Sequence, residues 1–169
     1  KADGVAFASR VSPDRVELLE QPCHMNDWDA AAALAKIDNV PLMLDESIYG
    51  DVEIERAAEL GGVTHVKLKL MKAGSIDNLM RQLRRIRELG MTPVLGNGVA
   101  AEPGCWMEAC VADALIDNAG EMNGFLKPKS QLFEEPLSVT DGAIVMPSEM
   151  PTLKDLKAFS VDHQIFLDT

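Results

Sequence analysis

Cysteine, histidine and aromatic residues are scarce in this sequence, and long apolar runs are missing. The three cysteines, Cys23, Cys105 and Cys110, are odd in number and irregularly spaced, so they indicate neither a disulfide framework nor a zinc-binding motif. No stretch approaches the roughly 20 apolar residues that a membrane-spanning helix needs, and the first residues lack the pattern of a signal peptide. We therefore expect a cytoplasmic protein without a membrane partner.

Basic residues are outnumbered by acidic ones. Of the 169 residues, 16 are Lys or Arg and 27 are Asp or Glu, which gives a formal net charge of −11. Because nucleic acids and anionic lipid surfaces attract clustered Lys and Arg, we expect no nucleic-acid partner. Hydrophobic residues make up 47% of the chain, which is typical of one folded globular domain.

Strand-like apolar runs alternate with helical segments along most of the chain. The runs lie at residues 16–22, 40–47, 65–70, 92–98 and 120–124, and helices are predicted at residues 28–36, 51–60, 75–89 and 103–115. Residues at one level of successive runs, Glu20, Asp45, Lys69, Leu95 and Glu121, recur about every 25 residues, the length of one strand plus one helix in a β/α barrel. The pattern predicts an α/β fold of the TIM-type (β/α) barrel, with its polar residues on the rim where catalytic groups collect. Because a closed barrel needs about eight strands, we expect only part of one here.

Two lysines share one face of the run at residues 65–70. Since side chains alternate along a strand, Lys67 and Lys69 point to one side and Val66 and Leu68 to the other. Buried parallel strands are normally apolar on both faces, so the two lysines indicate either a special cavity or a solvated edge strand. Lys72 is interpreted as a residue of the first turn of a helix rather than a catalytic group.

The pattern changes from Pro136 onward. A turn at residues 141–142 precedes a short strand at 143–146, and the remainder is rich in proline and charge. We expect residues 1–135 to form the barrel part of the chain and residues 136–169 to form a tail that leaves it.

Three motifs together resemble a known family. They are Leu19-Glu20-Gln21-Pro22, Leu44-Asp45-Glu46-Ser47 and Lys69-Leu70-Met71-Lys72-Ala73-Gly74. In this order and spacing they resemble the C-terminal half of the enolase superfamily, in particular the muconate-lactonizing subgroup of cycloisomerases and epimerases. The resemblance implies about strands 4 to 8 of the barrel, with the first half and a capping domain absent from this chain and a tail that returns toward that domain.

The resemblance also implies roles for individual residues. Glu20 and Asp45 are similar to two of three carboxylate ligands of a Mg²⁺ ion, with Mn²⁺ as an alternative, and Lys69 resembles the catalytic acid or base. Lys67 is placed beside it as a second catalytic candidate without a defined partner. The remaining candidates, which would support the metal or contact the substrate, are Glu46, Asn97, Glu121 and Asn123. The third metal ligand and a second catalytic lysine of the family are expected outside this chain.

The residue types suit proton abstraction next to a carboxylate. Such a proton is weakly acidic, so its removal needs a cation that stabilises the developing negative charge and a base within reach. A lysine stands where mandelate racemase relatives carry an aspartate, and the histidine of those relatives is missing after the strand at residues 92–98. The sequence therefore favours lysine-based chemistry.

The leading hypothesis is a Mg²⁺-dependent isomerase, either a racemase or epimerase or a cycloisomerase, that acts on a small carboxylate substrate. One alternative is a lyase, such as a dehydratase or an o-succinylbenzoate synthase-like enzyme that performs β-elimination. Another is a non-catalytic barrel remnant that serves as a binding module, in which Glu20 and Asp45 would be helix caps or ion-pair partners. The family resemblance further implies a homo-oligomer.

Overall fold

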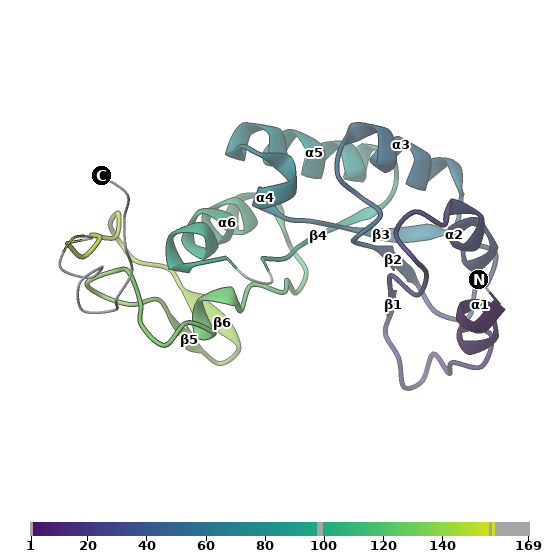
Figure 1. Cartoon of the computed structure of the whole chain (residues 1–169), viewed down its shortest axis with the longest axis horizontal. Helices are drawn as coiled ribbons and strands as arrows, with labels where there is room; N and C mark the ends of the chain where they lie inside the picture. Colours follow the sequence, from purple (N-terminus) through teal and green to yellow (C-terminus); the bar gives the residue numbers. More distant parts are fainter. Residues whose placement is uncertain (1, 98–99, 156, 158–169) are drawn as a thin grey trace.

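A parallel sheet of four strands, each followed by a helix, forms the centre of the molecule (Figure 1). The computed structural model of the chain describes residues 2–97, 100–155 and 157. The strands stand side by side in chain order and are β1 (Leu19–Glu20), β2 (Leu42–Leu44), β3 (Val63–Leu68) and β4 (Thr92–Leu95). A single parallel bridge between Gly96 and Glu121 adds a fifth position beside β4. The predicted alternation of strands and helices is confirmed.

Within the described residues, the four predicted helices are present, together with a helix before β1 and a single turn directly after β3. They are α1 (Ala2–Ala8), α2 (Trp28–Leu34), α3 (Asp51–Glu59), α4 (Leu70–Ala73), α5 (Ile76–Glu88) and α6 (Glu102–Leu115). The hydroxyl of Ser75 caps α5 by accepting a hydrogen bond from the backbone N–H of Asn78 at 3.2 Å. Gly74 ends α4 in the left-handed conformation, with φ of 78°, which glycine adopts without steric cost.

The main core lies between the sheet and helices α3 and α5, which run along one face of it (Figure 1). Val66 and Leu68 of β3 are fully buried there, together with Leu79 and Ile86 of α5. Burial of each such side chain contributes about 1.5–3 kcal/mol. Because this face of β3 is occupied by apolar packing, Lys67 of β3 and Lys69, directly after the strand, are left on the opposite face. β3 pairs with β2 and β4, so the alternative of a solvated edge strand is wrong.

The segment after the sheet packs against α6. A short 3-10 helix, η1 (Gly124–Leu126), precedes a hairpin of β5 (Ser138–Thr140) and β6 (Ala143–Val145) that lies beside α6 in Figure 1. The predicted strand at 143–146 and the turn before it are confirmed, whereas β5 was not predicted. Phe133 and Leu137 are buried in one cluster, although they lie on opposite sides of the boundary expected after residue 135. That boundary stays a prediction. Residues 156 and 158–169 of the expected tail lie outside the described part of the chain.

Within the ranges that the structure describes, no helix is both long and apolar enough to cross a membrane.

Glu102, at the start of α6, is a buried carboxylate that binds the tail. Its side chain is 1% exposed, and its two oxygens accept hydrogen bonds from the backbone N–H groups of Leu132, Phe133 and Leu137 at 2.9, 2.8 and 2.6 Å. Hydrogen bonds to a charged acceptor are stronger than neutral ones, and donors left unsatisfied after burial carry a desolvation penalty. Glu102 therefore joins residues 131–137 to α6.

We expect Glu102→Ala to lower the free energy of unfolding by about 3 kcal/mol or more, since three backbone donors lose a charged acceptor. Glu102→Gln should cost less, because its one carbonyl oxygen still accepts part of the set. Urea denaturation measures the loss, and hydrogen exchange should localise it to residues 131–137. The matched control is Glu59→Ala on the exposed end of α3, which should change stability by no more than about 0.5 kcal/mol. Equal effects of Glu102→Ala and Glu59→Ala would contradict this role.

Candidate active site

Asp45 directly follows β2 and is surrounded by lysine side chains. It is only 1% exposed. Lys69 Nζ donates to Asp45 Oδ2 at 2.7 Å, and Lys72 Nζ donates both to Oδ1 and, at 2.5 Å, to the backbone carbonyl of Asp45. Lys67 Nζ lies 3.9 Å from Oδ2. Three ammonium groups thus compensate a single buried carboxylate.

Lys67 connects Asp45 to two further carboxylates. Its side chain is 2% exposed, and its Nζ donates to Glu20 Oε1 at 2.7 Å and to Glu121 Oε2 at 2.5 Å. Glu20 ends β1 and Glu121 pairs with the residue after β4, so the two acids come from opposite edges of the sheet. Among the predicted site residues, the structure therefore brings Glu20, Asp45, Lys67, Lys69 and Glu121 together.

Gln21 holds the turn that carries Asp45. Its Oε1 accepts hydrogen bonds from the backbone N–H of Asp45 at 2.9 Å and of Ser47 at 3.2 Å, and its Nε2 donates to Ser47 Oγ at 2.8 Å. The backbone of Gln21 has a positive φ of 39°, which turns its side chain toward the next strand end. The Glu-Gln-Pro motif thus supplies one carboxylate and positions another.

The charges in this cluster shift several pKa values. Burial alone would raise the pKa of Asp45, but the hydrogen bonds and charges of Lys69 and Lys72 outweigh it, so its pKa lies below the usual value. Burial would lower the pKa of Lys67, yet its bonds to Glu121 and Glu20 raise it overall. For Lys72, burial prevails over Asp45 and the pKa is lowered. Asp45 is accordingly ionised and Lys67 is an ammonium group at neutral pH.

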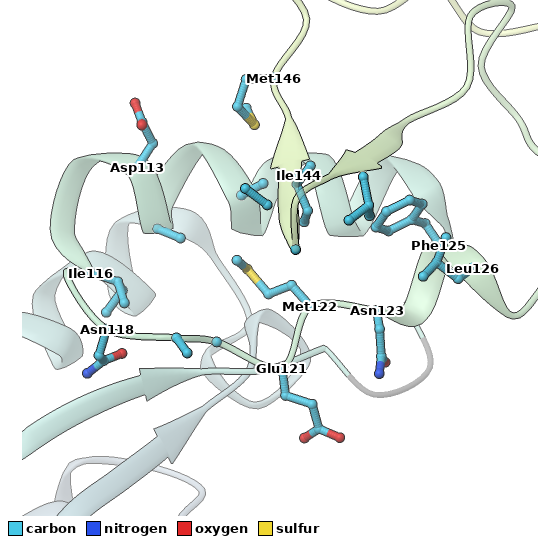
Figure 2. Close-up of a pocket in the computed structure, with 17 residues that line it drawn as sticks. Asp113, Ile116, Asn118, Glu121, Met122, Asn123, Phe125, Leu126, Ile144 and Met146 are labelled. Atoms are coloured by element: carbon cyan, nitrogen blue, oxygen red, sulfur yellow. The ribbon is translucent and has the colours of Figure 1, made fainter.

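The other predicted site residues lie at the margin of this cluster. Glu46 is exposed beside Asp45, where its charge acts on Lys72 in the direction of a higher pKa. Asn97 is buried; its Oδ1 accepts a hydrogen bond from the backbone N–H of Gly124 at 3.0 Å, and its side chain also interacts with the carboxyl group of Glu108. Asn123 is exposed and points to the same side as Glu121, as Figure 2 shows. Gly98, in the predicted turn after Asn97, lies outside the described residues.

Sequence reasoning missed two residues of the site. Lys72 is part of α4, as expected, but its ammonium group also folds back to Asp45, a contact that the sequence did not indicate. Glu108 of α6 is 2% exposed, and its Oε1 accepts a hydrogen bond from the backbone N–H of Leu70 at 2.7 Å, immediately after Lys69. Burial raises the pKa of Glu108. In the sequence, the signal for Glu108 was an acidic residue among the mainly apolar residues on the buried face of its helix, since such an acid is rarely buried without a partner.

A cavity of about 510 Å³ lies between α6, residues 118–123 and the β5–β6 hairpin (Figure 2). Met122 and Ile144 point into it, whereas Glu121 and Asn123 point away from it. This cavity is therefore on the other side of the backbone from the carboxylate and lysine cluster, and it is not the candidate active site.

The donor set of the cluster fits a hard divalent cation. Glu20 and Asp45 place carboxylate oxygens around one ammonium group, which shows that a positive charge is stabilised at this point. Mg²⁺ prefers such oxygen ligands and usually keeps several waters beside one or two carboxylates. No group of three or more His, Cys, Asp or Glu side chains is arranged to hold a metal ion within residues 2–97, 100–155 and 157. Glu20 and Asp45 thus fit as part of a ligand set.

Comparisons with curated proteins find relatives of three kinds. The chain is 26% identical over 147 residues to muconate cycloisomerase 1 of Rhodococcus opacus, which covers 83% of this chain and 38% of that protein. It is 30% identical over 94 residues to L-amino acid-D/L-Glu epimerase of Francisella philomiragia, covering 56% and 24%. It is also 30% identical over 109 residues to o-succinylbenzoate synthase of Salmonella arizonae, covering 63% and 33%. The chain spans less than half the length of each of these relatives.

Solved structures and a family model agree on the fold. The muconate lactonizing enzyme from Klebsiella pneumoniae matches with a TM-score of 0.80 at 23% identity, over 86% of this chain and 42% of that one. A sequence model of the family described as Enolase C-terminal domain-like matches residues 1–151. The resemblance to the enolase superfamily that the three motifs indicated is confirmed. Because the family match extends over most of its length, the chain belongs to the Enolase C-terminal domain-like family and forms the C-terminal portion of a (β/α) barrel.

Proposed function

We propose that the protein carrying this chain is a Mg²⁺-dependent isomerase, a racemase or epimerase or a cycloisomerase, that removes a proton α to a carboxylate. The observation that carries the proposal is the 2.7 Å contact of Lys69 Nζ with Asp45 Oδ2, which places an acid–base group beside a candidate metal ligand. The curated relatives include epimerases and a cycloisomerase, which supports the same class of chemistry.

Three residues of the cluster, and two residues that position them, have distinct parts in this proposal. Lys69, which is partly exposed, takes and returns the substrate proton through Nζ. Glu20 and Asp45 would hold the cation, which when bound supplies electrostatic stabilisation of the negative charge that builds on the substrate carboxylate. Lys72 and Gln21 keep the Asp45 carboxylate in place through their hydrogen bonds.

The proposed substrate is a small carboxylate. The exposed side chains of Glu121 and Asn123 lie on the side of the strand end that faces the cluster, so they are placed to contact it. Mn²⁺ is a second candidate cation, since it also accepts oxygen ligands. A cytoplasmic location, a homo-oligomeric state, and the absence of nucleic-acid and membrane partners remain predictions from the sequence.

A lyase is the second candidate function, and the match to o-succinylbenzoate synthase favours it. Both reactions begin with removal of the same proton and differ in the second step, which is reprotonation in the isomerase and loss of a β-substituent in the lyase. Incubation with Mg²⁺ and a panel of carboxylates in D₂O, followed by proton NMR, separates them. Deuterium incorporation without elimination supports the isomerase, and an unsaturated product supports the lyase.

We expect Lys69→Ala to reduce α-proton exchange in D₂O by about 10²–10⁴-fold, because the group that moves the proton is gone. Proton NMR measures exchange on a panel that includes Ala-Glu dipeptides and muconate. Lys36→Ala, at an exposed turn position just after α2, removes a lysine outside the site and should leave exchange unchanged. Exchange at the wild-type rate in Lys69→Ala would remove the acid–base role from this residue.

We expect Asp45→Asn to weaken Mg²⁺ binding by more than the 10–100-fold typical of outer-shell changes, since a charged ligand oxygen is lost. Isothermal titration calorimetry measures the affinity, and circular dichroism checks that the variant is folded. Asp38→Asn, an exposed acid after α2, is the matched control and should bind Mg²⁺ as the wild type does. A wild-type protein without any specific Mg²⁺ site would instead favour the binding-module alternative.

A further inference from the structure

The proposed chemistry makes no use of the charge of Lys67. This residue lies on β3 two positions before Lys69, and it is 2% exposed, whereas the side chain of Lys69 is 17% exposed. Its ammonium group is directed at the oxygens of Glu20 and Glu121 and approaches Asp45. A buried charge on a sheet is expensive unless it is paired, so these contacts account for its presence.

The neighbouring strand leaves room for this side chain. Gly96 follows β4 beside Lys67, and a Cβ atom there would lie 3.2 Å from Lys67 Cε and 3.3 Å from Cδ. The φ of Gly96 is not in the left-handed region, so space rather than backbone conformation explains the glycine. The position of the Lys67 side chain, with its ammonium group at the carboxylates, thus depends both on β3, which carries the lysine, and on the glycine after β4, which leaves space for it.

We propose that Lys67 competes with the metal ion for the carboxylate of Glu20. Its ammonium group neutralises Glu20 and must leave it when a divalent cation binds. This inference rests on the proposed function, because that function assigns Glu20 and Asp45 to the cation. One Glu20 oxygen is bonded to Lys67 Nζ at 2.7 Å, and the nearer Asp45 oxygen is 3.9 Å away. A divalent cation on the same oxygens would stand close to an ammonium group and be repelled by it.

Glu121 can keep the displaced ammonium group of Lys67 paired with a negative charge. It already accepts a hydrogen bond from Lys67 Nζ at 2.5 Å and is half exposed. Lys67 can therefore give up Glu20 and retain Glu121, so its charge stays paired while the cation binds. Asp45 has Lys69 and Lys72 as its close partners and lies 3.9 Å from Lys67 Nζ, so the proposed competition by Lys67 concerns Glu20 first.

The first test compares Lys67→Met with the wild type in the protein that carries this chain. Methionine has a similar length and no charge, so the affinity for Mg²⁺, measured by calorimetry, should increase by about tenfold or more. In EDTA, the same variant should have a lower melting temperature than the wild type, because Glu20 and Glu121 lose their counter-charge. Added Mg²⁺ should raise its melting temperature by more than that of the wild type. Lys67→Gln, which keeps a donor for Glu20, provides the same affinity comparison if Lys67→Met does not fold.

The second test removes the other partner of Lys67. Glu121→Gln should weaken Mg²⁺ binding, because Lys67 then has only Glu20 and Asp45 to pair with. In the Lys67→Met background the same substitution should have little effect. If Glu121 acted only through its own charge, it would weaken binding equally in both backgrounds, and that additive result would overturn the role of Lys67.

The outcomes separate this inference from the function on which it rests. Equal Mg²⁺ affinities of wild type, Lys67→Met and Lys67→Gln would overturn the competition while leaving the metal-dependent function in place. Failure of all three to bind Mg²⁺ or Mn²⁺ would overturn the metal assignment of Glu20 and Asp45, and the inference with it. Tighter binding by the neutral variants, with a non-additive Glu121→Gln effect, is the result we expect.

Discussion

The arrangement of the site depends on how the charge of one buried carboxylate is compensated. Asp45 is almost completely inaccessible, and an isolated carboxylate in such a place would be strongly unfavourable. Lys69 and Lys72 bond to it from the end of β3 and from α4, and together they hold its pKa below the ordinary value. The geometry of β3 and of the turn after it is therefore coupled to the position of the acid, and both strand ends are aligned by the same electrostatic interaction.

The parallel sheet makes this alignment possible. Since β1, β2, β3 and β4 run in the same direction, their C-terminal ends meet at one edge, and residues about 25 positions apart become neighbours. Apolar packing against α3 and α5 occupies one face of β3, which leaves Lys67 for the other face. The backbone segments that carry Asp45 and Lys69 are held by side chains that bond to backbone groups. Gln21 accepts a hydrogen bond from the N–H of Asp45, and Glu108 accepts one from the N–H of Leu70, next to Lys69.

Much of this could be predicted from the sequence, because it depends on local pattern and spacing. The alternation of runs located the helices, and the recurrence of Glu20, Asp45 and Lys69 placed them on one rim. The contact of Lys72 with Asp45 was not predicted, because helix position alone does not show where a long, flexible side chain ends. Helix α4 is a single turn closed by Gly74, and the Lys72 ammonium group reaches back to Asp45. Glu108 was missed because its partner, the N–H of Leu70, is brought to it by tertiary packing. Strand β5 was missed because its three residues are all exposed and form no apolar run.

Helix α6 makes contact with two distant parts of the molecule through acids on its buried face. Near its start, Glu102 binds the backbone of the segment that leads to the hairpin, and further along Glu108 binds the N–H of Leu70. The two acids belong to one continuous helix of 14 residues, so they cannot shift independently. A displacement of the segment that leads to the hairpin would therefore pass through the helix and Glu108 to the backbone beside Lys69, so a change at the periphery of the fold has a mechanical route to the candidate site.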